Sequence, residues 1–120
     1  MTTGLPRERF HSPILINETD HPAPLQLQTG RRYRLRLINI TPDDLDMEVS
    51  LTEAGRPVVW TAIARDSRDL PAEYVSAQNA VVRLPVASTA DFEYVPKAKT
   101  ELVFSAKQEQ ISCAMAISVN

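Results

Sequence analysis

The stretch that decides the fold is Gly30-Arg31-Arg32-Tyr33-Arg34-Leu35-Arg36-Leu37-Ile38-Asn39-Ile40-Thr41. Apolar and aromatic residues alternate with arginines along it, which is the period-2 pattern of a strand with one face in a core and one in water. Gly30 precedes the strand as a turn residue, and Thr41-Pro42-Asp43-Asp44 ends it with turn chemistry. The alternation lapses at Leu37-Ile38, which predicts burial on both faces at that end or a β-bulge.

Short strands are also predicted on the N-terminal side of this stretch. Residues 13–16 are an apolar run bounded by polar residues, as in a fully buried strand. Leu25 and Leu27 alternate with glutamines and predict a short strand paired with the strand at 33–41.

The second half of the chain continues the same pattern. Residues 47–52 and 57–64 predict the two strands of a hairpin with a turn at 53–56. Residues 72–78 are the only place where a helical turn is expected. Further strands are predicted at 81–86, 92–94, 102–104 and 111–119.

These segments together predict an all-β sandwich or Greek-key barrel of about eight short strands. Nine prolines and the lack of any long helical period argue against helices. The core is predicted to contain Ile14, Ile16, Leu25, Leu27, Tyr33, Leu35, Leu37, Val49, Leu51, Trp60, Ile63, Phe92, Leu102, Phe104, Ile111 and Met115.

Length and composition predict the number of domains and exclude some classes of partner. A chain of 120 residues with 43% hydrophobic residues predicts one domain, at 11–120, after a polar leader at 1–10. A net charge of −2 with both signs mixed gives no footprint for nucleic acid. No run is long enough for a membrane span, and the first residues lack the apolar segment of a signal peptide.

Four segments match, in order, the pattern of one protein family. Residues 13–17 resemble its P-x-x-I-N-G opening strand, and residues 25–41 resemble its L-x-V-x-x-G-x-x-Y-R-L-R-L-I-N strand pair. Residues 60–67 are similar to its I-A-x-D-G turn, and residues 88–96 are similar to G-E-T-Y-D-F-E-F-T-P. In this order the segments resemble the multicopper oxidase family, over about four fifths of the chain.

The resemblance implies a cupredoxin-like Greek-key sandwich of bacterial type, cut from a larger oxidoreductase outside the cytoplasm, for instance in the periplasm. The chain departs from the family at positions where glycine is usual, since Glu18 and Ser67 stand there. The resemblance also implies copper in the parent protein.

The copper ligands of the family are missing from their expected places. A blue-copper centre takes two histidines, a cysteine and usually an axial methionine. The two histidines, His11 and His21, lie near the start of the chain, away from the family's ligand motifs. If 47–52 is the strand that carries H-x-H in the family, Ser50 and Thr52 stand where the histidines would be.

The remaining soft donors are Cys113 and Met115 in the last strand. They are two residues apart, so both side chains face the same way, about 7 Å apart. Without a neighbouring histidine, the interpretation we favour is that both pack in the core. The sequence therefore predicts no catalytic, cofactor-binding or metal-binding residue in this domain, and no cofactor of its own.

Acidic residues form the other candidate metal site. Asp66 with Asp69, and Asp43 with Asp44 and Asp46, could bind a hard cation such as calcium. Aspartate is also the expected turn former, and this structural role is the one we favour. Neither histidine has a partner that indicates serine-type catalysis.

Two further patterns have both a functional and a structural interpretation. Arg32, Arg34 and Arg36 could dock an anionic partner, although a solvated strand face is the commoner explanation. Asn17 and Asn39 begin N-x-T sequons, but such short patterns arise by chance, and Asn39 is expected to form hydrogen bonds in a loop at the strand end.

Two hypotheses from different classes remain open. One is a copper-free cupredoxin-like domain of a multicopper-oxidase-like protein that serves as a structural module between domains. The other is a stand-alone immunoglobulin-like binding or adhesion domain. They differ in whether the parent reading frame continues into domains with H-x-H and H-C-H motifs.

The last predicted strand, 111–119, suggests where a partner would bind. Its odd-numbered residues are apolar and are expected in the core, whereas Ser112, Ala114, Ala116 and Ser118 face the other way. A solvated strand face usually carries charge, and this one has none. We expect it to pack against a neighbouring cupredoxin domain or a second copy, unless a loop of the same domain covers it.

Overall fold

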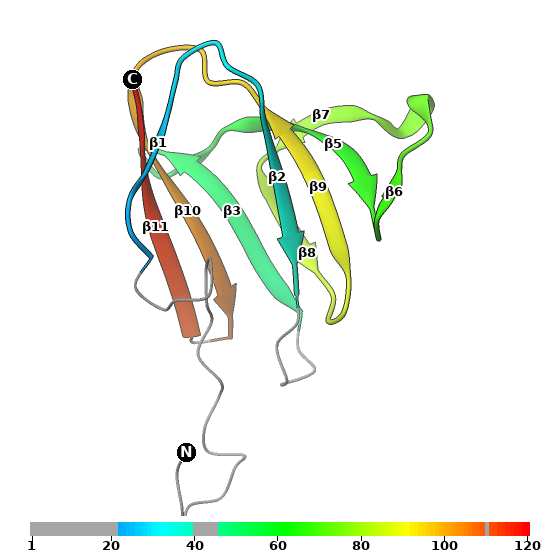
Figure 1. Ribbon diagram of the computed structural model, residues 1–120. Coiled ribbons are helices and arrows are strands. Elements are labelled where there is room, and N and C mark those ends of the chain that lie inside the picture. The colour runs from blue at the N-terminus through cyan, green and yellow to red at the C-terminus, as the bar shows by residue number, and fades with distance from the viewer. Residues whose placement is uncertain (1–21, 40–45, 110) are drawn as a thin grey trace, which may run out of the picture.

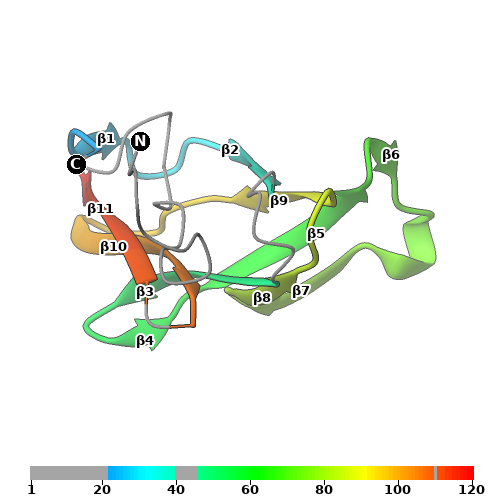
Figure 2. The ribbon, with the colours of Figure 1, turned by 90° about the horizontal axis from the view of Figure 1, so that it is seen from below.

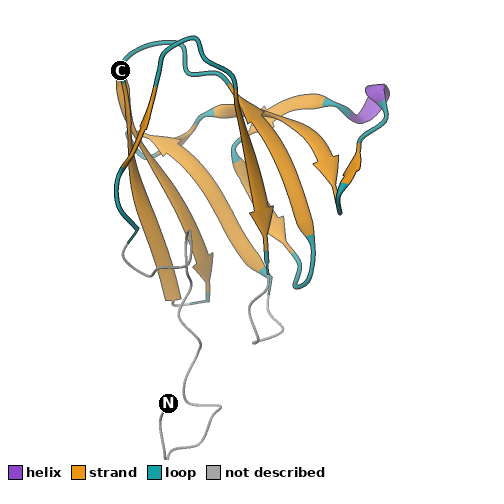
Figure 3. Cartoon of the chain, in the orientation of Figure 1, coloured by secondary structure: helices purple, strands orange, loops and turns teal. Residues whose placement is uncertain are grey.

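The computed structural model describes residues 22–39, 46–109 and 111–120, most of which lie in strands (Figure 1, Figure 3). Six strands belong to one sheet: β1 (Leu25–Leu27), β3 (Met47–Glu53), β4 (Arg56–Pro57), β8 (Val81–Leu84), β10 (Thr100–Gln108) and β11 (Ile111–Val119). Five belong to the other: β2 (Tyr33–Ile38), β5 (Val59–Arg65), β6 (Arg68–Asp69), β7 (Ser76–Asn79) and β9 (Thr89–Tyr94). The predicted all-β fold is confirmed.

The two sheets face each other as the layers of a sandwich (Figure 2). The six-stranded sheet has the order β1-β11-β10-β3-β4, and β8 also pairs with β3. The five-stranded sheet has the order β2-β9-β5-β6, and β7 also pairs with β5. All described strand pairs are antiparallel except β1 with β11. In these orders β1 is an edge strand of the six-stranded sheet, and β2 is an edge strand of the five-stranded sheet.

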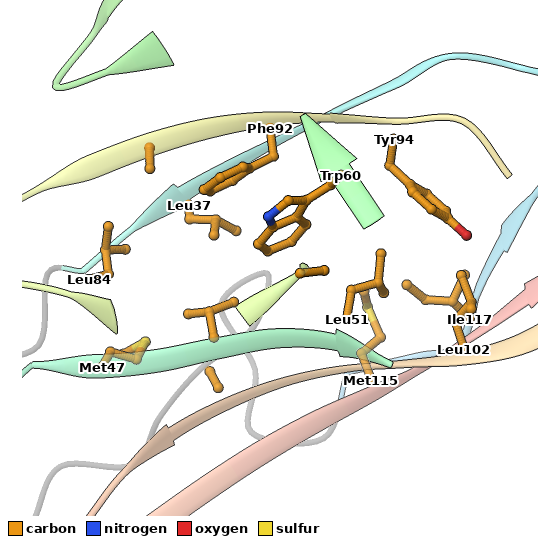
Figure 4. Packing of buried hydrophobic residues seen from close by; sticks show 14 of the residues in the cluster. Leu37, Met47, Leu51, Trp60, Leu84, Phe92, Tyr94, Leu102, Met115 and Ile117 are labelled. Atoms are coloured by element: carbon orange, nitrogen blue, oxygen red, sulfur yellow. The ribbon is translucent and has the colours of Figure 1, made fainter. Parts of the chain in front are cut away.

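The core fills the space between the sheets, because every second residue of the long strands points inward. Trp60 on β5 stacks on Phe92 of β9, with ring centroids 4.1 Å apart and an angle of 16° between the planes (Figure 4). Leu51 and Leu102 from the opposite sheet are also almost fully buried. Stacked aromatic pairs add about 0.5–1.5 kcal/mol to the stabilisation from burial alone.

Most of the predicted core residues are where the sequence placed them. Eight are buried: Leu27, Leu37, Val49, Leu51, Trp60, Phe92, Leu102 and Met115. Four are partly buried and pack against these: Tyr33, Leu35, Phe104 and Ile111.

Two other residues that were predicted in the core are more exposed than predicted, and two lie outside the described residues. Leu25 is 39% exposed because it belongs to an edge strand. Ile63 is only partly buried, because it lies at a register shift between Ala62 and Ala64 of β5. Ile14 and Ile16 are not among the described residues.

The predicted pairing of the 25–27 strand with the 33–41 strand is wrong. β1 instead pairs in parallel with β11, with Leu25 opposite Ile117 and Leu27 opposite Val119. The connection between β1 and β2 crosses to the other sheet, and Gly30 on the way donates its N–H to the carbonyl of Pro96 (2.8 Å). Alternation shows which face of a strand is buried, but it does not identify the neighbouring strand.

The predicted hairpin of 47–52 with 57–64 is only partly correct. β3 does turn back at Ala54-Gly55, where both residues have positive φ, but its partner β4 ends at Pro57. Proline cannot donate to the ladder. After it the chain crosses over, and β5 joins the other sheet beside β9.

Two local predictions concern the end of β2 and the segment 72–78. Ile38 is 50% exposed, and its pairing with β9 continues without a shift, so neither burial on both faces nor a bulge occurs at Leu37-Ile38. The helical turn expected within 72–78 is the short η2 (Ala72–Tyr74), a 3-10 turn that leads into β7. None of the described helices is long and apolar enough to cross a membrane.

Candidate functional site

The soft donors Cys113 and Met115 both point into the core, as predicted. Each is almost fully buried among apolar residues of both sheets. His11 and His21 lie outside the described residues, and within the described ranges no three His, Cys, Asp or Glu side chains are placed to share a metal ion. The donors that the structure describes therefore do not fit a blue-copper centre, which needs imidazoles beside the thiolate.

Ser50 and Thr52 are in β3, on the face opposite the core. The Ser50 Oγ lies 2.9 Å from the Oγ of Ser105 on the neighbouring β10. Thr52 donates its hydroxyl to the carbonyl of Val103 at 3.4 Å. Both hydroxyls bond across the strands of their own sheet.

Three of the five carboxylates considered for a hard cation are described, and each of them contacts another residue of the chain. Asp66 accepts a hydrogen bond from the backbone N–H of Thr89 (3.1 Å), which ties the β5–β6 turn to β9. Asp69 lies 4.0 Å from a guanidinium nitrogen of Arg34, and Asp46 lies 3.9 Å from one of Arg83. Asp43 and Asp44 are outside the described residues.

The arginine row of β2 faces acidic residues of β9. Arg34 Nε donates to Asp91 Oδ2 at 2.7 Å, and Arg36 donates to the same oxygen through Nε (3.2 Å) and Nη2 (3.1 Å). Arg32 lies 3.5 Å from Glu93. The row is therefore largely neutralised by its neighbouring strand, which supports the structural interpretation over an anion-docking stripe.

The side chain of Asp91 is only 1% exposed, because the two half-exposed arginines cover it. Burial alone raises the pKa of this carboxyl. Hydrogen bonds from Arg36 and Arg34, and the positive charges of both, outweigh that effect and hold the pKa of Asp91 below its ordinary value of 3.8.

Asn39, the first residue of the second sequon, is fully buried. Its side-chain nitrogen donates to the carbonyl of Leu84 at 2.9 Å. Its backbone N–H and carbonyl bond to Ser88 (3.1 Å) and Ala87 (2.7 Å). The prediction of a hydrogen-bonded loop residue is confirmed, and the full burial of this side chain leaves no space for a glycan on its nitrogen.

The side of the six-stranded sheet that faces away from the core, which we call the outer face, has an uncharged centre. Two rows of directly opposite residues cross four strands there. One row is Val81, Ser50, Ser105 and Ala114, and the other is Pro57, Thr52, Val103 and Ala116.

Charged residues border this centre at both ends. On one side lies a row in which Glu48 is opposite both Arg83 and Lys107. On the other, Glu101 accepts a hydrogen bond from Ser118 (3.2 Å). An uncharged centre with a polar rim is the usual arrangement of a protein interface.

The centre of the outer face is open to solvent. Ala114 and Ala116 are exposed, and Val103 beside them is 44% exposed. Among residues 22–39, 46–109 and 111–120, no loop covers these positions, and the alternative of a covering loop is not supported by this part of the chain. The sequence pattern of β11 predicts only one part of this face. Its continuation on β3 and β10 is visible in the sequence as small or β-branched residues at every second position, but the pattern does not show that these strands pair.

The fold resembles domains of known oxidases. A multicopper oxidase from Pseudomonas thermotolerans superposes with a TM-score of 0.60 at 18% identity, over 80% of this chain and 22% of that chain. A second multicopper oxidase gives 0.64 at 11% identity, over 81% of this chain and 32% of that chain.

The blue copper oxidase from Nitrosomonas europaea gives a TM-score of 0.59 at 13% identity, over 81% of this chain and 30% of that chain. The fold is cupredoxin-like. These low identities concern the fold alone, and the chain spans between about a fifth and a third of the length of these oxidases. No family model and no curated protein matches the sequence.

Proposed function

We propose that this chain is a copper-free cupredoxin-like domain of a multicopper-oxidase-like protein, and that it is a structural module between domains. The observation that carries the proposal is the outer face, whose uncharged centre crosses four strands and is at least partly exposed to solvent. The donor set of the described residues supports the copper-free assignment. On this proposal the domain is not catalytic, and any oxidase chemistry, with its copper, belongs to other domains of the parent chain.

The proposed partner of the outer face is a neighbouring cupredoxin domain, whose place a second copy takes when the domain is alone. Strands lie about 4.8 Å apart, so the uncharged centre is only about 14 Å wide. A stable interface buries about 800 Å² on each side, so the charged rows at Glu48 and Glu101 would be included as its rim. The association should therefore weaken at high salt.

The resemblance to oxidases also supports a Greek-key winding, a bacterial origin and a place outside the cytoplasm, for instance the periplasm. These remain part of the proposal. The alternative of a stand-alone immunoglobulin-like adhesion domain has no structural observation in its favour, whereas the similarity to oxidase domains covers about four fifths of the chain.

A charge in the centre of the outer face tests the proposal. Ala116→Glu should abolish concentration-dependent association of the chain in analytical ultracentrifugation, while its melting temperature stays within the small range typical of surface substitutions. Ala77→Glu is the matched control, because Ala77 is an exposed alanine in β7 of the other sheet. A chain that stays monomeric at millimolar concentration, or that associates equally well with Ala116→Glu, would contradict the proposal.

A further inference from the structure

One end of the sandwich contains a second candidate site, a cavity that we call the end pocket. It lies between residues 53–59, which include the β3–β4 turn, and residues 94–100, which connect β9 to β10. Figure 2 shows both segments at the same side of the molecule. The volume of the end pocket is about 450 Å³. Small-molecule sites in proteins usually measure about 300–1,000 Å³, so this cavity is large enough for a small ligand.

Apolar side chains form much of the wall of the end pocket. Val58 and Val59 line it from the first segment, and Val95 lines it from the second. Val59 is 56% exposed and Val95 is 38% exposed, although valine is among the residues most often buried. Contact with these side chains would remove apolar surface from water. The wall therefore favours a ligand with an apolar body.

Tyr94 adds a polar group to this wall. The residue is only 9% exposed, yet its hydroxyl forms no hydrogen bond with a described residue. In Figure 4 the hydroxyl points away from Trp60. Buried tyrosine hydroxyls usually have a hydrogen-bond partner. An oxygen atom of a ligand would supply the missing acceptor.

Glu53 indicates which cavity this hydroxyl faces. Tyr94 also borders an apolar cavity of about 220 Å³ near β1 and β2, where no carboxylate is among the described lining residues. The end pocket contains the carboxylate of Glu53, which accepts a hydrogen bond from the Thr100 hydroxyl. Burial, and then the negative charge of Glu53, raise the pKa of Tyr94 above its ordinary value of 10.0. The hydroxyl therefore lies close enough to Glu53 to be affected by its charge, and it is a donor at neutral pH.

The charges at the end pocket are unbalanced. Arg56 and Lys97 line it, together with the single carboxylate of Glu53. Both cations are exposed, and neither forms an ion pair with a described residue. Arginine and lysine form strong, charge-assisted hydrogen bonds with carboxylates. The excess of positive charge therefore favours a ligand with an acidic group.

We propose that the end pocket binds a small hydroxylated carboxylic acid with an apolar body. The apolar body lies against the three valines, and the ligand carboxylate lies beside Arg56 and Lys97. The ligand hydroxyl accepts a hydrogen bond from Tyr94 and donates one to Glu53. A cavity of about 150 Å³ already holds a benzene molecule, so the end pocket has room for an aryl ring that carries both groups.

NMR titration of the isotope-labelled full chain with para-hydroxybenzoate tests the proposal. Saturable shifts are expected at the backbone amides of residues 53–59 and 94–100. Two analogues each lack one feature of this probe, since benzoate has no hydroxyl and para-hydroxybenzamide has no charge. Each analogue should bind about fivefold more weakly than para-hydroxybenzoate, because each loses one set of hydrogen bonds.

Two substitutions with matched controls identify the groups that make these contacts. Tyr94→Phe keeps the ring and should abolish the preference for para-hydroxybenzoate over benzoate. Tyr74→Phe should leave this preference unchanged, because Tyr74 is 64% exposed and lies outside the two segments of the pocket. Lys97→Gln should reduce the preference over para-hydroxybenzamide. Lys99→Gln, at an exposed lysine that is not among the residues lining the pocket, should not.

Four results would overturn the proposal. They are the absence of saturable shifts at millimolar probe, equal affinities for the three compounds, an unchanged preference in Tyr94→Phe, and shifts confined to β1 and β2. The last result would assign the ligand to the apolar cavity near those strands. If Tyr94→Phe does not fold, the three compounds and the two lysine variants still decide the outcome.

Discussion

Arg34 Nε donates a 2.7 Å hydrogen bond to Asp91 Oδ2, across the pair of strands β2 and β9. Arg36 bonds to the same carboxylate, so a buried acid is held between two half-exposed bases. A buried carboxylate is tolerated only when it is paired and hydrogen-bonded. This group therefore ties the edge strand β2 to the rest of its sheet.

Asp91→Asn should destabilise the domain. The substitution removes the charge that both arginines contact, and hydrogen bonds to charged groups contribute about 1.5–3 kcal/mol each to stability. We expect a loss of about 2 kcal/mol in the free energy of unfolding, measured by urea titration. Asp69→Asn is the control, because Asp69 is exposed and 4.0 Å from Arg34, and exposed pairs contribute about 0–1 kcal/mol. Equal effects of the two variants would show that Asp91 has no special role.

The same carboxylate predicts a direction for acid sensitivity. The pKa of Asp91 is lowered in the folded protein, so its contribution to stability is complete above its ordinary value of 3.8 and is lost as the pH falls through the folded value. Carboxyl NMR titration should find this low pKa, and replacing Arg34 and Arg36 with glutamine should raise it. A pKa above 3.8 in the unmodified protein would be inconsistent with the geometry described.

Ser67→Gly should stabilise the domain. Asp66 and Ser67 form the two-residue turn between β5 and β6, and both have positive φ (49° and 66°). The left-handed conformation costs a side-chain-bearing residue about 1–2 kcal/mol, and glycine is favoured in such hairpin turns. We expect a gain of about 1 kcal/mol in chemical unfolding. Ser76→Gly, in the exposed strand β7, should instead reduce stability, because glycine weakens strands.

Phe92→Ala should be strongly destabilising. Phe92 is buried against Trp60, and truncation of a buried phenylalanine costs about 3–5 kcal/mol. Trp60 is the only tryptophan, so its fluorescence reports both the lost stacking and the unfolding transition. Tyr74→Ala removes an aromatic ring that is exposed and should change stability by less than about 0.5 kcal/mol.

Reconstitution with copper should leave the chain colourless. The reason is the donor set: Cys113 lies among apolar residues, and no histidine occurs in the described ranges. After incubation with cupric salt and dialysis, metal analysis should find far less than one copper per chain. An intense blue colour would show that His11 or His21 reaches Cys113, and it would contradict the copper-free proposal.

The positions of the longer strands were predictable from this sequence, whereas the short strands β6 and β7 and most strand partners were not. Alternation identified which residues of β2 and β11 face the core, because side-chain period alone determines that. It did not reveal that β1 pairs with β11, since partner choice depends on how connections cross between the sheets. One signal was available: Arg34 and Arg36 on one strand match Asp91 on another, and opposite charges favour neighbouring positions in a sheet.

The outer face, too, could be predicted only in part from the sequence, because its extent depends on which strands pair. Its β11 part was predicted from Ser112, Ala114 and Ala116, and these positions do face away from the core. Its full extent required the register of β3 and β10, which places Ser50 opposite Ser105. Small residues at alternate positions indicate a possible contact strand, but only the pairing shows whether several such strands form one surface.

The parallel pairing of β1 with β11 also determines how the domain responds to mechanical force. The chain enters β1 at one end of the sheet and leaves β11 at the opposite end (Figure 1). Tension between Leu25 and Asn120 acts along these strands and loads their hydrogen bonds in shear, including that from the Asn120 N–H to the Leu27 carbonyl (2.9 Å). Bonds in shear must break together, whereas those of the antiparallel pair β10 and β11 would open one at a time if pulled apart at their turn. The domain should therefore yield abruptly, and at high force, when it is stretched along its chain.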